Sequence, residues 1–376
     1  MGGLAAAIGL RRVGFGVTVV ERARVLDDAG AGISLAANGI RALDALGVGD
    51  AVRAASARQL TGGTRTPRGG LLAEMDGAAL ERALGAPIAG IPRSDLHAVL
   101  RAALAPGALV TGAEVTALDL ADPARPRVAF GGTTLAADLV VAADGVGSRL
   151  RGRLFPTAPG HVHSGSTVLR AITERPVEVG GDFELTWGRG AEFGHLRFAD
   201  GRVEWHAVLN APAGVRYPDP LAEVRRRFGH WHDPIPALLA ATAPKAVLHH
   251  DIAELRTPLP SFVSGRVALL GDAAHAMTPH LGQGDCQALE DAVTLAAALA
   301  GEPSIDAALH RYDAERRPRA QSVARAARRA GRMGEQLAHP VAVAARNAAL
   351  RLAPAGATVR AILRHAAWVP PRLDPR

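Results

Sequence analysis

The chain has 376 residues, of which 48% are apolar and 21% charged, a composition that fits two or three packed units and excludes a disordered chain. The formal charge of +7 comes almost entirely from arginine, and the arginines form no stripe interleaved with aromatic residues, so nucleic-acid binding is not predicted. The single cysteine, Cys286, excludes an internal disulfide and fits a reducing cytoplasm, and no apolar run reaches the roughly 18 residues of a membrane span. We therefore predict a cytoplasmic protein with no membrane span and no metal site.

The first elements are typical of half a nucleotide-binding unit. Residues 2–12 predict a helix rich in Gly and Ala, and the β-branched run 17–20, which ends at Glu21, predicts a buried parallel strand. A helix followed by such a strand is the second half of a βαβ unit, and the first strand is missing from the sequence. Further along, the pattern predicts helices at 38–46 and 94–104, loops and short strands over 61–90, and strands at 128–130 and 139–143.

The pattern changes between about residue 160 and residue 255. Short strand-like segments separated by Gly or Asp turns predict a mostly antiparallel sheet, with strands at 166–171, 183–187, 194–198 and 203–209. A short parallel-type strand at 267–270 follows, and then helices near 285–300, 304–334 and 338–365. The whole pattern indicates an α/β fold with an inserted antiparallel sheet and C-terminal helices.

The start of the first helix is one candidate site. Gly2 and Gly3 open the helix and Glu21 follows about 18 residues after Gly3, as in the G-x-G-x-x-G pattern, where a phosphate approaches the helix N-terminus and the acid binds a ribose hydroxyl. Only the last glycine of that pattern, Gly3, is present. An ordinary helix–strand pair that ends in a glutamate is the alternative interpretation.

Two aspartates follow predicted buried strands. Asp144 precedes a glycine turn, where a carboxylate can touch a diphosphate or hold backbone N–H groups, although a structural turn is the alternative. Asp272 can accept hydrogen bonds from sugar-like hydroxyls. The glycine-rich loop 279–284 can lie against a planar ring, and the helix that follows directs its positive dipole end at whatever lies in front. This last pattern indicates a ligand site.

In this order and spacing, the patterns resemble the class A flavoprotein monooxygenases, the para-hydroxybenzoate hydroxylase and salicylate hydroxylase group, without the N-terminal strand. The resemblance covers nearly the whole chain and rests on the segments 19–22 (Val-Val-Glu-Arg), 92–96 (Pro-Arg-Ser-Asp-Leu), 143–149 (Ala-Asp-Gly-Val-Gly-Ser-Arg), 187–190 (Trp-Gly-Arg-Gly), 271–275 (Gly-Asp-Ala-Ala-His), 287–292 (Gln-Ala-Leu-Glu-Asp-Ala) and 312–318 (Tyr-Asp-Ala-Glu-Arg-Arg-Pro). It implies a discontinuous Rossmann-like FAD-binding domain (1–65, 89–160 and 256–335), a substrate-binding sheet domain (66–88 and 161–255) and a C-terminal helical segment (336–376).

The resemblance also implies roles in binding FAD. Glu21, with Arg22 beside it, would bind the adenosine ribose, and Val115 would contact adenine through its backbone. Arg93 would contact FAD between pyrophosphate and flavin, Asp144 would serve both FAD and NAD(P)H, and Asp272 would hold the ribityl chain. Gly3 would lie near the phosphates, and Gly282, Gln283 and Gly284 would lie along the isoalloxazine. The chain departs from the family at His280, usually Asn, and at Asp285, usually a small residue, whose charge is unfavourable near an anionic flavin.

The implied reaction uses NADH or NADPH to reduce FAD, forms a flavin C4a-hydroperoxide from O2, and hydroxylates a small aromatic substrate, a phenol or an aromatic acid. A general base that removes a phenol proton makes the ring more nucleophilic. The candidates are His206, His195 and His280, each with a surface or core role as the alternative. Arg170 or Arg189 can pair with a substrate carboxylate. A monomer or homodimer is expected.

Two other interpretations stay open at this point. A flavin-dependent halogenase shares the fold but uses a lysine near the flavin and a W-x-W-x-I-P segment, which Trp231 to Pro236 matches only in half, while Lys245, the one lysine, stands in a different context. The other interpretation is a truncated or degenerate flavoprotein that cannot hold FAD and has no activity.

Overall fold

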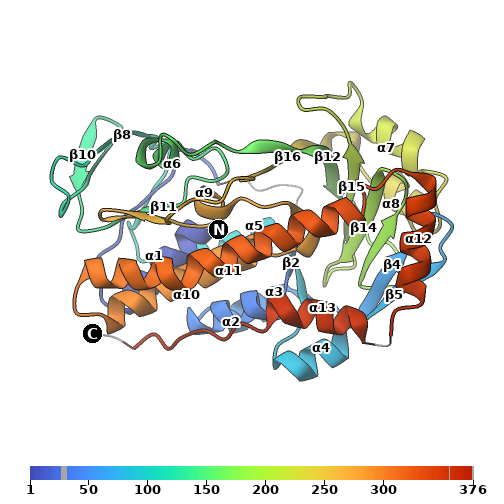
Figure 1. Cartoon of the computed structure of the whole chain (residues 1–376), viewed down its shortest axis with the longest axis horizontal. Helices are drawn as coiled ribbons and strands as arrows, with labels where there is room; N and C mark the ends of the chain where they lie inside the picture. The colour runs from blue at the N-terminus through green and yellow to red at the C-terminus, as the bar shows by residue number, and fades with distance from the viewer. Residues whose placement is uncertain (27–31, 355, 375–376) are drawn as a thin grey trace.

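The computed structural model describes residues 1–26, 32–354 and 356–374. It is a mixed α/β fold with several sheets (Figure 1), as the sequence predicts. Outside the large sheet described below, its parallel strands lie in two groups. In one, β1 (Val19–Val20) pairs with β7 (Leu109–Val110); in the other, β11 (Val140–Ala142) pairs with β18 (Val267–Leu269), which also pairs antiparallel with β17 (Val263–Ser264).

The first helix connects the two groups of parallel strands. α1 (Gly2–Arg12) contacts both β1 and β11, and its residues from Leu4 to Leu10 are buried. It packs closely on α10 (Gly284–Gly301), because a Cβ added at Gly9 would lie 3.1 Å from the Cβ of Ala296. Among the described residues, β1 pairs only with β7, and β11 pairs only with β18.

A seven-stranded sheet forms the second half of the molecule. Its order is β16 (Leu248–Glu254), β12 (Val162–Ile172), β15 (Val203–Asn210), β14 (Ala191–Arg197), β13 (Phe183–Trp187), β4 (Thr61–Arg65) and β5 (Leu71–Asp76), and only β13 and β4 pair in parallel. The predicted division ended the first FAD-binding range at residue 65 and so placed β4 in that part. The structure instead makes β4 part of this sheet.

Side chains alternate between the two faces of that sheet. On the outer face, Phe193 and Trp205 stack with ring centroids 5.6 Å apart and pack with α7 (Pro220–Phe228) and α8 (Ile235–Ala240). On the inner face, Arg170 donates to the backbone oxygen of Gly32, and Phe183 packs on the main core. The inner face is therefore the one turned toward the α/β part.

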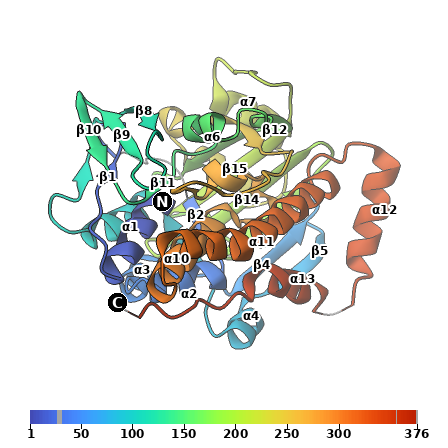
Figure 2. The same cartoon turned by 60° about the vertical axis from the view of Figure 1, so that its left-hand side comes forward.

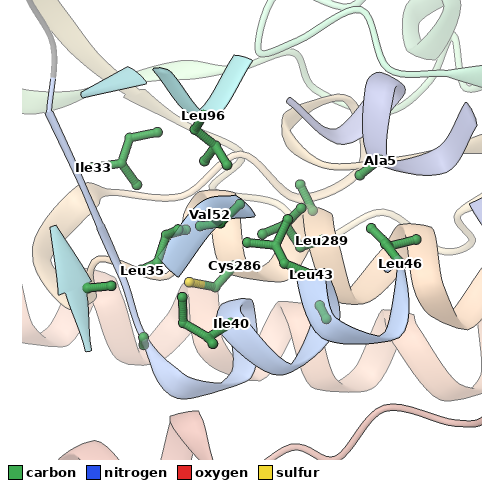
Figure 3. Packing of buried hydrophobic residues seen from close by; sticks show 14 of the residues in the cluster. Ala5, Ile33, Leu35, Ile40, Leu43, Leu46, Val52, Leu96, Cys286 and Leu289 are labelled. Atoms are coloured by element: carbon green, nitrogen blue, oxygen red, sulfur yellow. The ribbon is translucent and has the colours of Figure 1, made fainter. Parts of the chain in front are cut away.

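The main core surrounds α10, which is buried along most of its length. Figure 3 shows Cys286 among Leu35, Ile40 and Leu43, next to α2 (Ala37–Ala45). A Cβ at Gly39 would lie 2.8 Å from the sulfur, so glycine is needed at this helix crossing. Burial raises the pKa of the Cys286 thiol to about 12, and the thiol acts as a small apolar group.

The remaining elements frame this core. Two small sheets are formed by β2 (Gly32–Leu35), β6 (Ala89–Pro92) and β3 (Ala57–Arg58), and by β8 (Val115–Asp119), β9 (Arg127–Phe130) and β10 (Thr133–Ala136). Shorter helices are α3 (Gly49–Ala55), α4 (Gly77–Leu84), α5 (Arg93–Ala102), α6 (Arg149–Leu154) and α9 (Asp272–His275), and single 3-10 turns lie at Pro244–Ala246 and Pro279–Leu281. The helix α4 lies where loops and short strands were predicted, although Asp76 caps it and Gly85 ends it with φ +69°.

The C-terminal helices differ from the prediction in one place. After α11 (Ile305–Met333), the predicted helix at 338–365 is two helices, α12 (Pro340–Arg351) and α13 (Ala357–Ala366). Pro354 has no backbone N–H, and Gly356, the residue before α13, adopts φ +74°, so neither residue suits the interior of one continuous helix. Figure 2 shows α12 at the edge of the molecule. None of the described helices combines the length and the apolar character needed to cross a membrane.

A buried ionic network holds α10 to α11. Arg316 donates to Glu290 at 2.5 Å and to Asp291 at 2.7 Å, and all three side chains are at most 1% exposed. Arg319 adds a second contact to Glu290, and His275 lies 2.6 Å from Asp291. The two carboxylates are tolerated in the core because each has more than one partner.

We expect the variant Arg316→Met to lower the free energy of unfolding by about 3–5 kcal/mol, because it leaves two buried carboxylates short of a partner. Arg311→Met, which removes a half-exposed pair with Glu315, is the control and is expected to cost less than about 1 kcal/mol. Urea denaturation followed by circular dichroism measures both. Equal losses in the two variants would contradict the role of the network.

Candidate functional site

The two aspartates predicted to follow buried strands lie at the same edge of one sheet. In the parallel pair β11 and β18, Val140 is opposite Val267 and Ala142 is opposite Leu269. Asp144 and Asp272 come two and three residues after these strands, and both side chains are exposed. Because parallel strands end at the same edge of a sheet, the two carboxylates open onto a shared region.

Arg151, which the sequence analysis missed, ties the two turns together. Its guanidinium donates to the backbone oxygens of Asp272 at 3.3 Å, Ala273 at 3.1 Å and Val146 at 2.7 Å. Desolvation lowers its pKa, and the charges of Asp144 and Asp272 oppose that shift. The available signal was its position in the sequence, because Arg151 follows Gly145 of the Asp-Gly turn by six residues. The five N–H donors of a guanidinium allow one arginine to satisfy carbonyl groups of both turns.

The carboxylate of Asp144 is partly used within its own turn. It accepts from Ser148 Oγ at 2.6 Å and from the backbone N–H of Leu150 at 3.2 Å, while Ser148 caps α6. Asp272 has a raised pKa, first through desolvation and then through the charge of Asp285. Asp272 is accessible to solvent, yet enough protein surrounds its carboxylate to desolvate it, as expected at the floor of an open cleft.

The charge of Asp285 is offset by Arg93. Nη1 of Arg93 lies 3.5 Å from Asp285 Oδ2, and the arginine also acts on the pKa of Asp272, which it lowers. Arg93 begins α5, and Asp285 lies in the first turn of α10. The structure therefore brings Arg93, Asp272 and Asp285 together at the start of α10, where the helix dipole is positive.

The loop before α10 presents backbone rather than side chains. Gly282 adopts φ +59°, and a Cβ added at Gly282 or Gly284 would meet no atom within 4 Å, so this part of the loop borders open space. The side chain of Gln283 instead points inward, where it accepts hydrogen bonds from Asn38 at 2.9 Å and from Gln287 at 3.1 Å. A flat ligand can approach the glycines because Gln283 holds the loop from behind.

The residues expected at the other end of a nucleotide also lie together. Glu21 ends β1, and its backbone pairs with Val110 and Ala113, next to Val115 at the start of β8. Its side chain accepts a hydrogen bond from the N–H of Ala23 at 2.8 Å, while Arg22 is exposed. At the start of α1, a Cβ on Gly3 would lie 3.3 Å from Ala143, so this glycine lets the helix approach the end of β11.

The three candidate histidines lie in two different places. His206 is on the inner face of β15, and His280, in the loop before Gly282, lies opposite that face. The structure does not bring His195 to them, because His195 shares the outer face of β14 with Phe193. Strand periodicity does not predict which face His195 or His206 occupies, because the two lie on different strands whose register the sequence does not reveal.

A chain of polar side chains crosses the inner face around His206. Nδ1 of His206 lies 3.2 Å from Glu204, which also accepts from Arg170 at 3.1 and 2.8 Å. Nε2 lies 3.9 Å from Glu192. A Cβ at Gly194, the cross-strand neighbour, would lie 2.2 Å from Nε2, so the imidazole occupies the space above this glycine.

His280 meets the same region from the loop. Its Nε2 lies 2.9 Å from Glu335, and Glu335 accepts a hydrogen bond from Ser166 on β12. Desolvation works against protonation of His280, but the contact with Glu335 and the charges of Glu192 and Glu254 raise its pKa. No local pattern points to Glu192, Glu204 or Glu335, because isolated glutamates on short strands and helix ends are usually surface residues.

Comparison with known proteins assigns the family. Residues 1–327 match the family described as FAD binding domain. The chain belongs to this family. It is an FAD-dependent monooxygenase, as its relatives are, and FAD is its cofactor.

Several relatives align with most of the length of this FAD-dependent monooxygenase. The Stigmatella aurantiaca aurachin C monooxygenase/isomerase is 39% identical over 338 residues, which are 89% of this chain and 88% of that protein. The FAD-dependent urate hydroxylase of Klebsiella pneumoniae is 30% identical over 335 residues, 88% and 87% of the two chains. The structure of Klebsiella pneumoniae HpxO with FAD and uric acid has a TM-score of 0.90 and 27% identity, covering 97% of this chain and 94% of that one.

The described residues fit FAD. Exposed carboxylates suit ribose and ribityl hydroxyls, the N-termini of α1 and α10 suit anionic groups, and the open backbone of Gly282 and Gly284 suits a planar ring. Arg93 supplies a cation beside them.

For the flavoprotein we expect Asp272→Ala to weaken FAD binding roughly tenfold to hundredfold, because hydrogen bonds from sugar hydroxyls to a carboxylate each contribute about 1.5–3 kcal/mol. Titration of the apoprotein with FAD, followed by flavin fluorescence, measures the affinity. Asp306→Ala, at an exposed surface pair with Arg266, is the matched control and should leave the affinity unchanged. An unchanged affinity in Asp272→Ala would refute this assignment.

His195 gives a pH prediction. Burial lowers its pKa from the usual 6.5 to about 4, so below pH 6.5 the unfolded chain takes up a proton that the folded chain does not. The free energy of unfolding should therefore fall by about 3 kcal/mol as the pH drops from 6.5 to 4, at about 1.4 kcal/mol per pKa unit. Urea denaturation across this range should show a loss in the wild type and in the exposed-site variant His310→Gln that is about 3 kcal/mol larger than the loss in His195→Gln, where other histidines with a lowered pKa still contribute. The same slope in all three proteins would contradict the prediction.

Proposed function

We propose that this chain uses NADH or NADPH and O2 to hydroxylate a small aromatic ring. The observation that supports it most is the placement of Asp144 and Asp272 at adjacent strand ends, beside a glycine loop and the start of α10. This arrangement suits an extended flavin nucleotide whose ring lies toward the seven-stranded sheet.

Different residues would contact different parts of FAD. Asp272 would hold the ribityl hydroxyls, and Asp144 and Arg93 would lie along the diphosphate. Glu21, with Arg22 beside it, and Val115 would take the adenosine end, and the backbone of residues 282 to 284 would lie along the isoalloxazine. Residues 1–65, 89–160 and 256–335, without β4, would then form the cofactor domain. Residues 66–88 and 161–255, together with β4, would form the substrate domain, and 336–376 a C-terminal helical segment.

The chemistry supplied by the bound cofactor is the transfer of a hydride from NAD(P)H and the activation of O2. One oxygen atom enters the ring in place of a hydrogen, the other leaves as water, and NAD(P)H is oxidised to NAD(P)⁺ with uptake of one proton. The protein orients the ring, excludes water and manages the proton of the ring hydroxyl.

His206 is the proposed base for that proton. Its Nδ1 faces Glu204, so Nδ1 donates and Nε2 is left as an acceptor. Glu204 is fixed in turn by Arg170. Burial and the pair of partners position the imidazole in the way that a carboxylate positions a catalytic histidine, and removal of a phenol proton increases the electron density of the ring.

The names of the relatives support ring hydroxylation. They include a urate hydroxylase and a 3-amino-4-hydroxybenzoate 2-monooxygenase, both of which act on rings. The halogenase interpretation gains nothing from the structure, because Lys245 is exposed in the turn before β16 and Trp231 packs against Phe228 on the outer side of the sheet. Neither residue meets the loop at Gly282.

Stimulated NAD(P)H oxidation tests the proposal. Purified protein loaded with FAD is expected to oxidise NADH or NADPH faster in the presence of one or more hydroxylated aromatic rings and to form one hydroxylated product per O2 incorporated, detected with ¹⁸O2 by mass spectrometry. His206→Gln is expected to retain FAD but to lower the rate of hydroxylation roughly a hundredfold, within the usual range for a lost general base. His249→Gln, on the opposite face of the same sheet, is the control. Loaded protein that yields no labelled product with any ring of a broad panel would overturn the proposed function.

A further inference from the structure

We propose that the ring bound by this chain is uncharged where it meets the inner face of the sheet, and that it donates a hydrogen bond to Glu192 instead of presenting a carboxylate to an arginine. The inference rests on the proposed function, since it describes the ring that the same site would hydroxylate. It concerns what we term the inner-face cluster: Arg170, Trp187, Glu192, Glu204, His206, His280 and Glu335.

The cluster lies between the sheet and the loop that leads to the cofactor glycines. Trp187 and Glu192 are cross-strand neighbours on β13 and β14, and Arg170 and His206 are cross-strand neighbours on β12 and β15. His280 is two residues before Gly282, and its charge acts on Glu192. A ring held between the sheet and that loop therefore contacts this cluster.

Each basic side chain of the cluster already has a carboxylate partner. Arg170 donates twice to Glu204, at 3.1 and 2.8 Å, and once to the backbone oxygen of Gly32 at 2.7 Å. His280 lies 2.9 Å from a carboxylate oxygen of Glu335. His206 lies 3.2 Å from Glu204. An anionic ligand would have to displace one of these partners, which would leave a buried carboxylate unpaired.

Two further arginines nearby do not supply the missing cation. Arg189 is exposed and donates to the backbone oxygen of Ala338 at 3.2 Å. The guanidinium of Arg346 lies over the ring of Trp187, 5.2 Å from the ring centre. It donates to the backbone oxygens of Met333 and Gly334 and to the side chain of Asn347. The expectation that Arg170 or Arg189 binds a substrate carboxylate therefore finds no support in these contacts.

Glu192 offers an acceptor instead. Its side chain is 8% exposed, and Oε2 accepts a hydrogen bond from Trp187 Nε1 at 2.5 Å. Among the described residues, Oε1 accepts no hydrogen bond, and the imidazole of His206, at 3.9 Å, is too far away to donate one. Because Oε1 is not among the buried side-chain atoms that lack a partner, it is accessible from the site, where a ring hydroxyl or amide N–H would donate to it.

A carboxylate on the ligand would be repelled by Glu192, whereas a hydrogen-bond donor would be attracted. The carboxylate would lie close to Glu192 and Glu335 in a poorly solvated region, where like charges repel strongly and one of them ionises only with difficulty. Such a ligand could bind only together with a proton. Discrimination against the wrong ligand by an unpaired like charge is a common source of specificity.

The test compares two ligands of equal size and different charge, 3-hydroxybenzamide and 3-hydroxybenzoate, with 6-hydroxy-2-naphthamide and 6-hydroxy-2-naphthoate as a larger pair. Binding to the FAD-loaded protein at pH 7.5 is measured by the perturbation of the flavin absorbance. In at least one pair the amide should bind about tenfold more tightly than the carboxylate or better, as expected for a like-charge contact in a poorly solvated site. Glu192→Gln should reduce that ratio toward one, whereas Arg189→Ala should leave it unchanged.

Three results would overturn the inference: tighter or equal binding of the carboxylates, an unchanged ratio in Glu192→Gln, or no binding of either member of both pairs. The product assay separates these failures from failure of the proposed function. A carboxylate that binds more tightly and is hydroxylated refutes only the inference about charge. An amide that binds more tightly while no ring is hydroxylated supports that inference and refutes the proposed function.

Discussion

The parallel pairing of β11 with β18 is the constraint on which the proposed cofactor site depends. It sets Ala142 beside Leu269, so that the turns carrying Asp144 and Asp272 leave the same edge of one sheet. In the sequence, 127 residues lie between these two aspartates. Each turn includes a glycine with positive φ, Gly145 and Gly271, where a side chain would strain the backbone. Arg151 then binds carbonyl oxygens of both turns, so the two carboxylates cannot move apart without breaking buried hydrogen bonds. A nucleotide that contacts both aspartates meets a site whose geometry exists before binding.

The position of α10 depends on buried polar groups in the same way. A helix whose N-terminus serves a ligand must be fixed along its axis, and apolar contacts alone tolerate sliding, because they have no direction. Gln283 is bonded to Asn38, Glu290 is bonded to Asn38 and Arg316, and Arg316 is bonded to Asp291, which also accepts from the N–H of Gly271 at 2.9 Å. These directional bonds run from the cofactor loop through α10 to the turn of Asp272. Their burial is costly unless all are made, so they specify one position of the helix relative to the strand ends.

The sequence predicted the parts of this arrangement that depend on local pattern. Strand ends followed by Asp-Gly or Gly-Asp, the glycine loop and the long buried helix all have signals within a few residues, and the structure has them at nearly the predicted positions. It did not predict the facing of the inserted strands, since His195 and His206 both alternate with apolar residues on short strands with apolar positions on both faces. It also missed Arg151, Glu192 and Glu335, whose partners are distant in sequence. Local propensity carries no information about such partners, because their burial is decided by the tertiary contact that neutralises them.

The inner face of the sheet shows how far a single small residue can determine the chemistry of a site. Gly194 stands opposite His206 in register, and any side chain there would overlap the imidazole. With that space open, His206 lies flat between Glu204 and Glu192, and the carboxylates of both strands face the region next to the cofactor loop. Arg170 is consequently bonded to Glu204, although its place on the adjoining strand would otherwise suit an anionic substrate. The charge that the site presents to a ring follows from this cross-strand packing, and a fold shared with other flavin monooxygenases does not determine it.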